Sequence, residues 1–313
     1  VECRILGYRP GRRAAIAYRV AELDGNHRMV LGKAFSHRRG QRLVQIHKEL
    51  NQRLSAVSNG RARAPHPIAY LDDLRLLLLT WDAEPQAADG LALLTNRAYA
   101  GIDLLTWLHR VSIDDLPEFS RDDDCVVLTR WQSALTMLDP PAARLTRSLH
   151  DALVELSSST ESHRSCTIHR DFYERQYAVD GSTISVFDLD TLARGDPGVD
   201  VGNFLAHLLL THLRSEYALQ DFVSLAAGLV RRYAEAGYAL DRRTLAFHWA
   251  SALFRLGAVH AFRTTTRKYV PALWQLSSDL LAQVFGRSFE GKAGFAGQAR
   301  VPNPQLVLEG SRS

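Results

Sequence analysis

The spacing of apolar residues changes along this chain of 313 residues. Residues 14–20 alternate apolar and polar side chains, which is the period of a half-buried strand. Residues 222–233 and 245–260 instead repeat apolar side chains every three or four positions, as an amphipathic helix does. Residues 41–54 place one such helix among the predicted strands. The pattern predicts an α+β protein in which a small β-rich part precedes a larger, mostly helical part.

A polar segment, residues 82–90, marks the boundary between these two parts. We therefore expect a bilobal protein, with residues 1–83 forming an N-terminal lobe and residues 84–285 a C-terminal lobe. Residues 286–313 are rich in glycine, proline and polar side chains, and we expect them to form a loosely ordered tail. The cleft between two lobes is the default place for a ligand.

The composition is that of an ordinary globular protein. No apolar run reaches the roughly 20 residues that a membrane-spanning helix needs, and no long basic run is present. We therefore expect neither a membrane partner nor a nucleic-acid partner. The formal net charge of +4 also suits phosphorylated small molecules. Three scattered cysteines, Cys3, Cys125 and Cys166, show no metal or redox spacing, which favours a reducing, cytoplasmic location.

Acidic residues and the amide of Gln176 gather in the segment 166–204. Asp171 is followed five residues later by Gln176, and a short strand-like run then ends at Asp188, with Asp190 close behind. Phosphoryl transfer needs a carboxylate that accepts the proton of the attacking hydroxyl, and hard oxygen ligands for magnesium. Each of these residues alone would fit a solvated loop. Together they favour a phosphoryl-transfer site.

This segment resembles a motif region of the aminoglycoside phosphotransferase and choline kinase family, whose members have a protein-kinase-like fold. Asp171 and Gln176 follow the kinase spacing H-R-D-x-x-x-x-N, with glutamine in place of asparagine. The resemblance implies that Asp171 is the catalytic base and that Gln176 and Asp188 hold magnesium. It also implies that Asp190 supports the metal or its waters.

The run FDLDTLARGDPGVDVGNFLAHL, residues 187–208, resembles the second motif of that family and the helix after it. The resemblance implies that Asp200 is a buried acid that holds the catalytic loop, and that His169 packs against this loop. Pro197 near a helix start and an apolar stripe at the helical period predict the same helix from the residues themselves.

A kinase-like fold also needs a strand lysine for the nucleotide phosphates and a helix glutamate that holds this lysine. Lys33 in VLGKAF resembles the V-A-I-K strand, in a chain with only four lysines. Leu31 falls on the same face of the strand and could line an adenine pocket. Glu49, in the helix predicted over residues 41–54, is the best candidate partner for Lys33. A surface lysine and a solvated glutamate are the ordinary alternatives.

Two further elements of a nucleotide site are predicted by position. The segment YRPGRRAA lacks a glycine-rich motif and predicts a tight hairpin, in which Arg12 or Arg13 touches phosphate or, more simply, is solvated. Residues Thr80 to Ala83 would form the hinge whose backbone binds adenine. The N-terminal lobe would thus bind the nucleotide.

Together these features predict an ATP- and magnesium-dependent phosphotransferase that acts on a hydroxyl group of a small molecule. A pseudokinase that binds nucleotide or a partner without turnover is the main alternative, because Gln176 departs from the motif. A protein kinase is disfavoured, because Asp188 is followed by Leu189 and Asp190 rather than by Phe and Gly. The acceptor would be aminated if its cleft is acidic, with candidate carboxylates at Asp103, Asp114, Asp115 and Asp221. The choice between ATP and GTP and the oligomeric state stay open.

Overall fold

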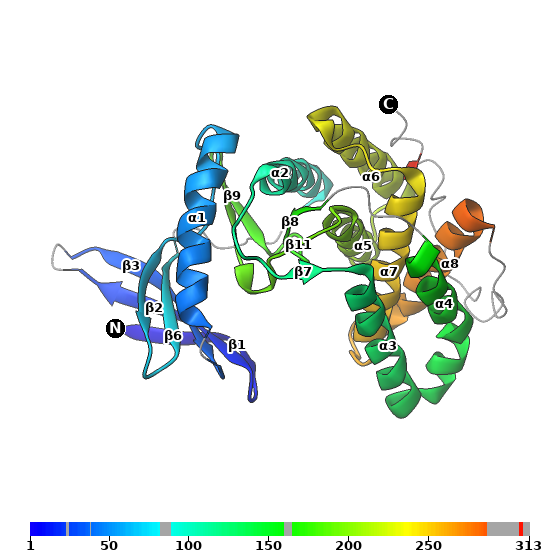
Figure 1. The fold of residues 1–313 in the computed structure, drawn as a ribbon, viewed down its shortest axis with the longest axis horizontal. Helices are drawn as coiled ribbons and strands as arrows, with labels where there is room; N and C mark the ends of the chain where they lie inside the picture. Colours follow the sequence, from blue (N-terminus) through cyan, green and yellow to red (C-terminus); the bar gives the residue numbers. More distant parts are fainter. Residues whose placement is uncertain (23–24, 38, 82–88, 160–164, 287–306, 309–313) are drawn as a thin grey trace. The chain divides into compact units, whose positions relative to one another are not determined.

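The structure is a computed structural model that describes residues 1–313 except 23–24, 38, 82–88, 160–164, 287–306 and 309–313 (Figure 1). The chain forms two compact units, which are described separately. Unit 1 comprises Val1–Ala87, Arg110–Asp115 and Arg175–Thr191. Unit 2 comprises Ala88–His109, Leu116–Glu174 and Leu192–Ser313. The lobes predicted above are contiguous in sequence, whereas unit 1 also takes residues 175–191, which carry Gln176 and Asp188. The predicted tail lies outside the described residues, apart from Gly286, Val307 and Leu308.

Unit 1 is built on a five-stranded antiparallel sheet, with the strand order β1-β2-β3-β6-β5. Its strands are β1 (Glu2–Arg9), β2 (Arg13–Ala21), β3 (His27–Phe35), β5 (Pro67–Leu71) and β6 (Leu76–Thr80). The predicted hairpin after β1 is confirmed: Arg12 N–H donates to the carbonyl of Arg9 at 3.0 Å, and Gly11 takes a φ of 66° in the turn. Such a positive φ is costly for other residues, which explains the glycine.

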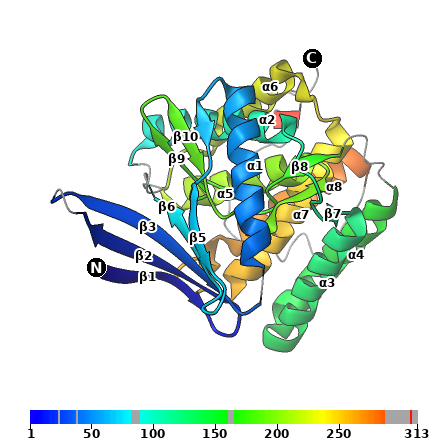
Figure 2. The same ribbon diagram turned by 60° about the vertical axis from the view of Figure 1, so that its left-hand side comes forward.

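One helix, α1 (Gly40–Ser58), packs against strands of unit 1 (Figure 2). Its buried face carries the predicted stripe of leucine and isoleucine, with Leu50 and Leu54 fully buried. A smaller sheet, with the order β4-β10-β9, joins β4 (Ala62–Arg63) to the hairpin of β9 (Tyr177–Asp180) and β10 (Thr183–Val186). Gln176 directly precedes β9, and Asp188 follows β10 by two residues, so this antiparallel hairpin brings both residues to the same end.

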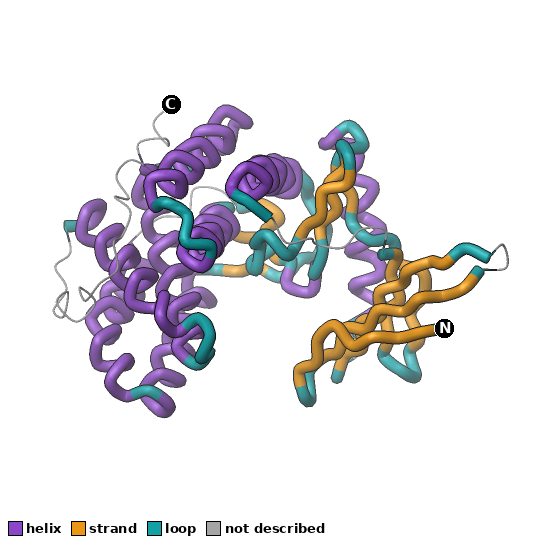
Figure 3. The backbone as a smooth tube through the Cα atoms, turned by 180° about the vertical axis from the view of Figure 1, so that it is seen from behind, coloured by secondary structure: helices purple, strands orange, loops and turns teal. Residues whose placement is uncertain are grey.

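Unit 2 is mostly helical, as the purple segments of Figure 3 show. Its helices are α2 (Leu91–Arg110, with Arg110 assigned to unit 1), α3 (Arg121–Leu138), α4 (Pro140–Ser159), α5 (Gly198–Arg214), α6 (Leu219–Tyr233), α7 (Arg242–Ala261) and α8 (Val270–Phe285). Short 3-10 or π segments cover Leu189–Thr191 in unit 1, and Ala234–Tyr238 and Arg267–Tyr269 in unit 2. The helices predicted over residues 222–233 and 245–260 are confirmed as α6 and α7.

The core of unit 2 forms where α5, α7 and α8 pack together. The stripe predicted for α5 is buried there: Phe204, Leu205 and Leu208 are each at most 1% exposed. A small sheet with the order β7-β11-β8 contains β7 (Glu118–Phe119), β8 (Cys166–Ile168) and β11 (Ala193–Gly195). Strand β8 leads directly into the segment that contains Asp171. The predicted α+β class is therefore confirmed. None of the helices in the described ranges has the length and hydrophobicity needed to span a bilayer.

Candidate active site

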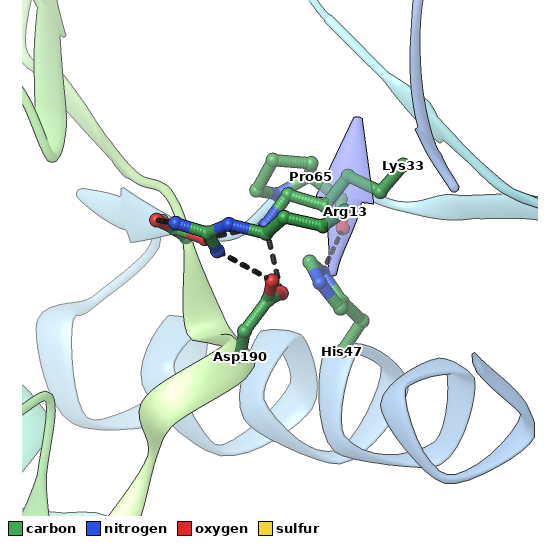
Figure 4. Close-up of polar contacts among 6 residues, drawn as sticks. Arg13, Lys33, His47, Pro65 and Asp190 are labelled. Carbon is green, nitrogen blue, oxygen red and sulfur yellow. Dashed lines mark hydrogen bonds and ion pairs between the residues drawn. The ribbon is translucent and has the colours of Figure 1, made fainter. Parts of the chain in front are cut away.

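Two cations and two carboxylates form a closed cluster in unit 1 (Figure 4). Lys33, on β3, lies with its Nζ 2.7 Å from Oδ1 of Asp188 and 2.8 Å from Oδ1 of Asp190. Arg13, the first residue of β2, donates from Nη1 to Asp188 at 2.9 Å and to Asp190 at 2.8 Å. Its Nη2 donates to the other oxygen of Asp188 at 3.2 Å. The structure therefore brings together three of the predicted residues and one arginine for which solvation was the simpler expectation.

The charges in this cluster hold one another in the ionised state. Burial alone raises the pKa of Asp188, but Lys33 and Arg13 outweigh burial and hold that pKa well below its ordinary value. Burial likewise lowers the pKa of Lys33, and the two carboxylates more than offset this, so that the pKa is raised. Asp188 thus keeps a carboxylate that can bind a cation at neutral pH.

The predicted pairing of Lys33 with Glu49 is wrong. Glu49 Oε1 lies 2.6 Å from Nη2 of Arg53 and accepts from the backbone N–H of Asp114 at 3.2 Å. Within the described residues no hydrogen bond or ion pair joins Lys33 to Glu49, because the lysine reaches the two aspartates instead. The position of Glu49 on α1 explains the error, since it lies at the edge of the apolar stripe rather than within it.

His47, which sequence reasoning missed, is the polar residue that α1 buries near Lys33. It is 1% exposed, and its Nδ1 bonds the carbonyl of Pro65 at 2.8 Å, so Nδ1 carries the proton (Figure 4). Its Nε2 has no hydrogen-bond partner among the described residues. Burial, followed by repulsion from Lys33, lowers the pKa of His47 to about 4. The sequence did carry a signal, because His47 follows Leu43 by four residues and precedes Leu50 by three.

The remaining predicted nucleotide contacts have mixed outcomes. Leu31 is buried on β3, two residues before Lys33, as predicted. The backbone N–H of Thr80 donates to the carbonyl of His66 at 2.8 Å, so this donor already has a partner within unit 1. Ala83 lies outside the described residues. A role of Leu31 and of Thr80 in binding adenine stays a prediction.

Gln176 and Asp188 together offer the oxygen donors that magnesium prefers. The N–H of Phe187 donates to the backbone carbonyl of Gln176 at 2.7 Å, which places Gln176 beside the residue before Asp188. The Gln176 side chain is buried and bonds no other described residue. Across the described residues no group of three or more His, Cys, Asp or Glu side chains has metal-binding geometry. One carboxylate with one amide oxygen fits magnesium that takes its remaining ligands from phosphate and water.

In unit 2, the segment around Asp171 is fixed by a buried carboxylate. Asp200 is fully buried and accepts from the backbone N–H of His169 at 2.6 Å and of Arg170 at 2.7 Å. His109 Nε2 lies 3.1 Å from the same carboxylate. The role that the resemblance implies for Asp200 is therefore what the structure shows.

This fixation coincides with local backbone strain. Arg170 has a φ of 72°, which is uncommon for a residue other than glycine. Asp171 is the next residue and is half-buried. His169 packs edge-on against Phe172, with 5.7 Å between the ring centroids. Such strain persists only where neighbouring contacts hold the backbone, and it is typical of functional loops.

Helix α5 holds the loop at a third point. Asn203 donates from Nδ2 to the carbonyl of Phe172 at 2.8 Å, and its Oδ1 accepts from the guanidinium of Arg255 on α7. Just before the helix, Asp196 accepts from the N–H of Gly198, the first residue of α5, at 2.8 Å. Asp200 and Asn203 lie three residues apart and therefore on one face of α5, which explains how one helix holds three residues of the loop.

Two of the four carboxylates considered for an aminated acceptor, those of Asp103 and Asp114, have other partners. Asp103 accepts from Nε and Nη2 of Arg232 at 2.8 and 3.0 Å. Asp114 lies 3.2 Å from Arg53, and the carbonyl of Asp115 accepts from Arg42; both contacts lie in unit 1. Asp221 lies in the first turn of α6. Asp103 and Asp221 belong to unit 2, whereas Asp114 and Asp115 belong to unit 1.

Comparison with known proteins shows which family this chain belongs to. Residues 15–248 match the model of the phosphotransferase enzyme family. No curated protein matches the sequence. Among solved structures, a choline kinase from Cryptosporidium parvum is 12% identical, with a TM-score of 0.59, and the match covers 97% of this chain and 93% of that one.

Two further structures are similar. An amicoumacin kinase in complex with AMP-PNP, Ca²⁺ and Ami is 12% identical, with a TM-score of 0.57 and coverage of 90% and 88%. An aminoglycoside phosphotransferase from Streptomyces rimosus is 18% identical, with a TM-score of 0.50 and coverage of 79% and 89%. At these identities the likeness shows the fold, which is protein-kinase-like. The family match spans most of the chain, and the chain therefore belongs to the phosphotransferase enzyme family, as a small-molecule kinase.

Proposed function

We propose that this protein transfers the γ-phosphate of ATP to a hydroxyl group of a small molecule, with magnesium as the metal and Asp171 as the base. The observation that carries the proposal is the pairing of Lys33 with Asp188 at 2.7 Å. A buried lysine and a carboxylate at the end of a hairpin are the parts that hold nucleotide phosphates and their metal in phosphoryl transfer.

In unit 1, Lys33 would bind the nucleotide phosphates when ATP replaces the carboxylates as its partner. Asp188 and Gln176 would hold magnesium, and Asp190 would orient Lys33 and the waters of the metal. Magnesium neutralises charge that develops on the phosphate oxygens. Glutamine reaches one methylene further than asparagine, and it still offers an amide oxygen of the same kind.

In unit 2, Asp171 would accept the proton of the acceptor hydroxyl as the oxygen attacks phosphorus. The loop that carries it is held by Asp200 and Asn203, so the carboxylate is positioned before the acceptor binds. Positioning of the reacting groups is the main contribution that a protein makes to phosphoryl transfer.

The proposal is tested by measuring ADP release with ATP, magnesium and a panel of hydroxylated acceptors. We expect the Asp171→Asn variant to lower turnover about 10²- to 10⁴-fold, the range for loss of a general base. Asp180→Asn, at the exposed last residue of β9, is the matched control and should retain wild-type turnover.

Equal turnover of the wild-type protein and of the Asp171→Asn variant would contradict the role of Asp171. Tight nucleotide binding without ADP release for any acceptor would instead support the pseudokinase alternative.

A further inference from the structure

The segment around Asp171 is connected through α5 to a cationic side chain of α7. The guanidinium of Arg255 donates to Oδ1 of Asn203, and Nδ2 of Asn203 donates to the carbonyl of Phe172 at 2.8 Å. A single side chain thus connects Arg255 to the residue that follows Asp171. All of these residues belong to unit 2.

Arg255 differs from Arg232 and Arg267 of unit 2 in its partners. It is half-buried, and no carboxylate of the described residues lies within the 4.0 Å of an ion pair. Arg232 and Arg267, by contrast, pair with Asp103 at 2.8 Å and with Asp139 at 2.7 Å. Asp124 attracts Arg255 from a greater distance, while Arg170 repels it. Burial of a cation without a paired anion lowers the stability of the folded protein, and a ligand that supplies the anion would offset this cost.

The neighbours of Arg255 increase the local positive charge. Tyr173, two residues after Asp171, stacks on His207 with 4.5 Å between the ring centroids. Burial, followed by repulsion from Arg255, His260 and Arg263, lowers the pKa of His207 to about 3. Two of these three neighbours, Arg255 and Arg263, are cationic at neutral pH.

The same pattern continues at His260. Burial, followed by repulsion from Arg263 and Arg214, lowers the pKa of His260 to about 4, and its Nδ1 bonds Oγ1 of Thr266 at 2.6 Å. Both histidines are neutral at pH 7, so the three arginines carry the charge. Arg214 and Arg263 are exposed, while Arg255 is half-buried. We call Arg214, Arg255 and Arg263, with His207 and His260, the basic cluster.

We propose that the acceptor of this kinase is an anion, a hydroxylated small molecule with a carboxylate or phosphate group that the basic cluster binds beside Asp171. The inference rests on the proposed function and names the substrate class. A guanidinium binds both oxyanions through two parallel hydrogen bonds, and Arg255 is already oriented by Asn203. Among the acidic residues considered for an aminated acceptor, Asp103 is already neutralised by Arg232.

The first test compares acceptors of similar size but different charge, by ADP release: glycerate, glycerol phosphate, glycerol and ethanolamine. We expect turnover with glycerate or glycerol phosphate at least tenfold above that with glycerol and ethanolamine, and the better of the two identifies the oxyanion. The Arg255→Gln variant should raise KM for that acceptor at least tenfold with a smaller change in kcat. Arg255→Lys should recover part of this loss, because it restores the charge without the planar fork.

Arg231→Gln is the matched control, because Arg231 is exposed on α6 and its side chain has no partner in the described part of the chain. It should behave as the wild-type protein does. If ethanolamine is the better acceptor, or if Arg255→Gln leaves KM for the anion unchanged, the inference is wrong while the proposed function stands.

The second test needs no turnover and avoids the half-buried residue. Inorganic phosphate should raise the unfolding temperature of the wild-type protein more than sodium chloride of equal ionic strength does, since a ligand of the folded state stabilises it. The double variant Arg214→Gln with Arg263→Gln should lose most of this shift, and Arg231→Gln should keep it. Equal shifts in all three proteins would overturn the inference. A shift that depends on the cluster, in a protein without kinase activity, would support the anion site and contradict the proposed function.

Discussion

Unit 1 and unit 2 each bury a key carboxylate, but they satisfy it by different means. In unit 1, Asp188 and Asp190 are paired with the side chains of Lys33 and Arg13. In unit 2, Asp200 is bonded by two backbone N–H groups and by His109. The side chains of Lys33 and Arg13 can rotate away from the two aspartates when a metal or a phosphate binds. The backbone N–H groups that bond Asp200 cannot move away unless the loop changes its conformation.

This difference matches the two tasks that we propose. The nucleotide and its metal enter and leave in every cycle, so their ligands need partners that can be exchanged. The catalytic carboxylate gains more from a fixed position, because a small displacement of a reacting group is costly. The following predictions test whether the two buried sites differ in this way.

The largest effect is expected for Asp200→Asn. Asp200 accepts from the backbone N–H groups of His169 and Arg170, and the asparagine amide would place its own N–H group against one of these donors. We therefore expect the free energy of unfolding to fall by about 3–5 kcal/mol. Urea unfolding measures this loss. Asp103→Asn, which breaks an exposed pair with Arg232, should cost less than about 1 kcal/mol. A similar, small loss in both variants would show that the buried carboxylate does not hold the loop.

A smaller effect is expected from His47 as the pH falls. The pKa of His47 is about 4 in the folded protein, compared with 6.5 for a histidine without burial or neighbouring charges. Between pH 4 and pH 6.5 the unfolded state therefore binds more protons than the folded state. Stability from neutral His47 is therefore complete above about pH 6.5 and is lost as the pH falls towards 4. Lys33 and His66 oppose protonation of His47, and Asp190 favours it.

The variant His47→Gln isolates this contribution. Gln can still donate to Pro65, and we expect the loss of stability between pH 7 and pH 4 to shrink by up to about 3 kcal/mol relative to the wild-type protein. The contributions of His207 and His260 are common to both proteins and cancel in the difference. An identical pH dependence in the two proteins would show that His47 is not held neutral.

The smallest effect is expected for Arg13→Ala. If Asp188 holds the metal as proposed, Arg13 competes with that metal in the absence of nucleotide. Removal of Arg13 should then tighten Mn²⁺ binding about tenfold, or about 1.4 kcal/mol. Electron paramagnetic resonance of free Mn²⁺ measures this affinity. Arg12→Ala is the control, because Arg12 is exposed and its side chain has no partner in the part of the chain that the structure describes. Equal affinities in both variants would show that Arg13 does not compete with the metal.

The sequence predicted the elements better than their side-chain partners. The strand of Lys33, the hairpin that delivers Asp188 and the helix that buries Asp200 follow from local periodicity and from motif spacing. Arg13 and Asp188 are 175 residues apart, and no local pattern predicts their contact. The motif predicts a glutamate on α1 as the partner of Lys33, and Glu49 fits that prediction, whereas the residue that the apolar stripe of α1 buries is His47. Arg255 carries no motif, and its role depends on how α5 and α7 pack.

The division of tasks is tested most directly by calorimetric titration of AMP-PNP, with and without magnesium, into the wild-type protein and into Asp171→Asn and Asp188→Asn. We predict that Asp171→Asn binds the nucleotide with wild-type affinity and with the same dependence on magnesium. We predict that Asp188→Asn loses most of the tightening by magnesium. Magnesium-dependent binding that survives in Asp188→Asn, or that is lost in Asp171→Asn, would contradict the account.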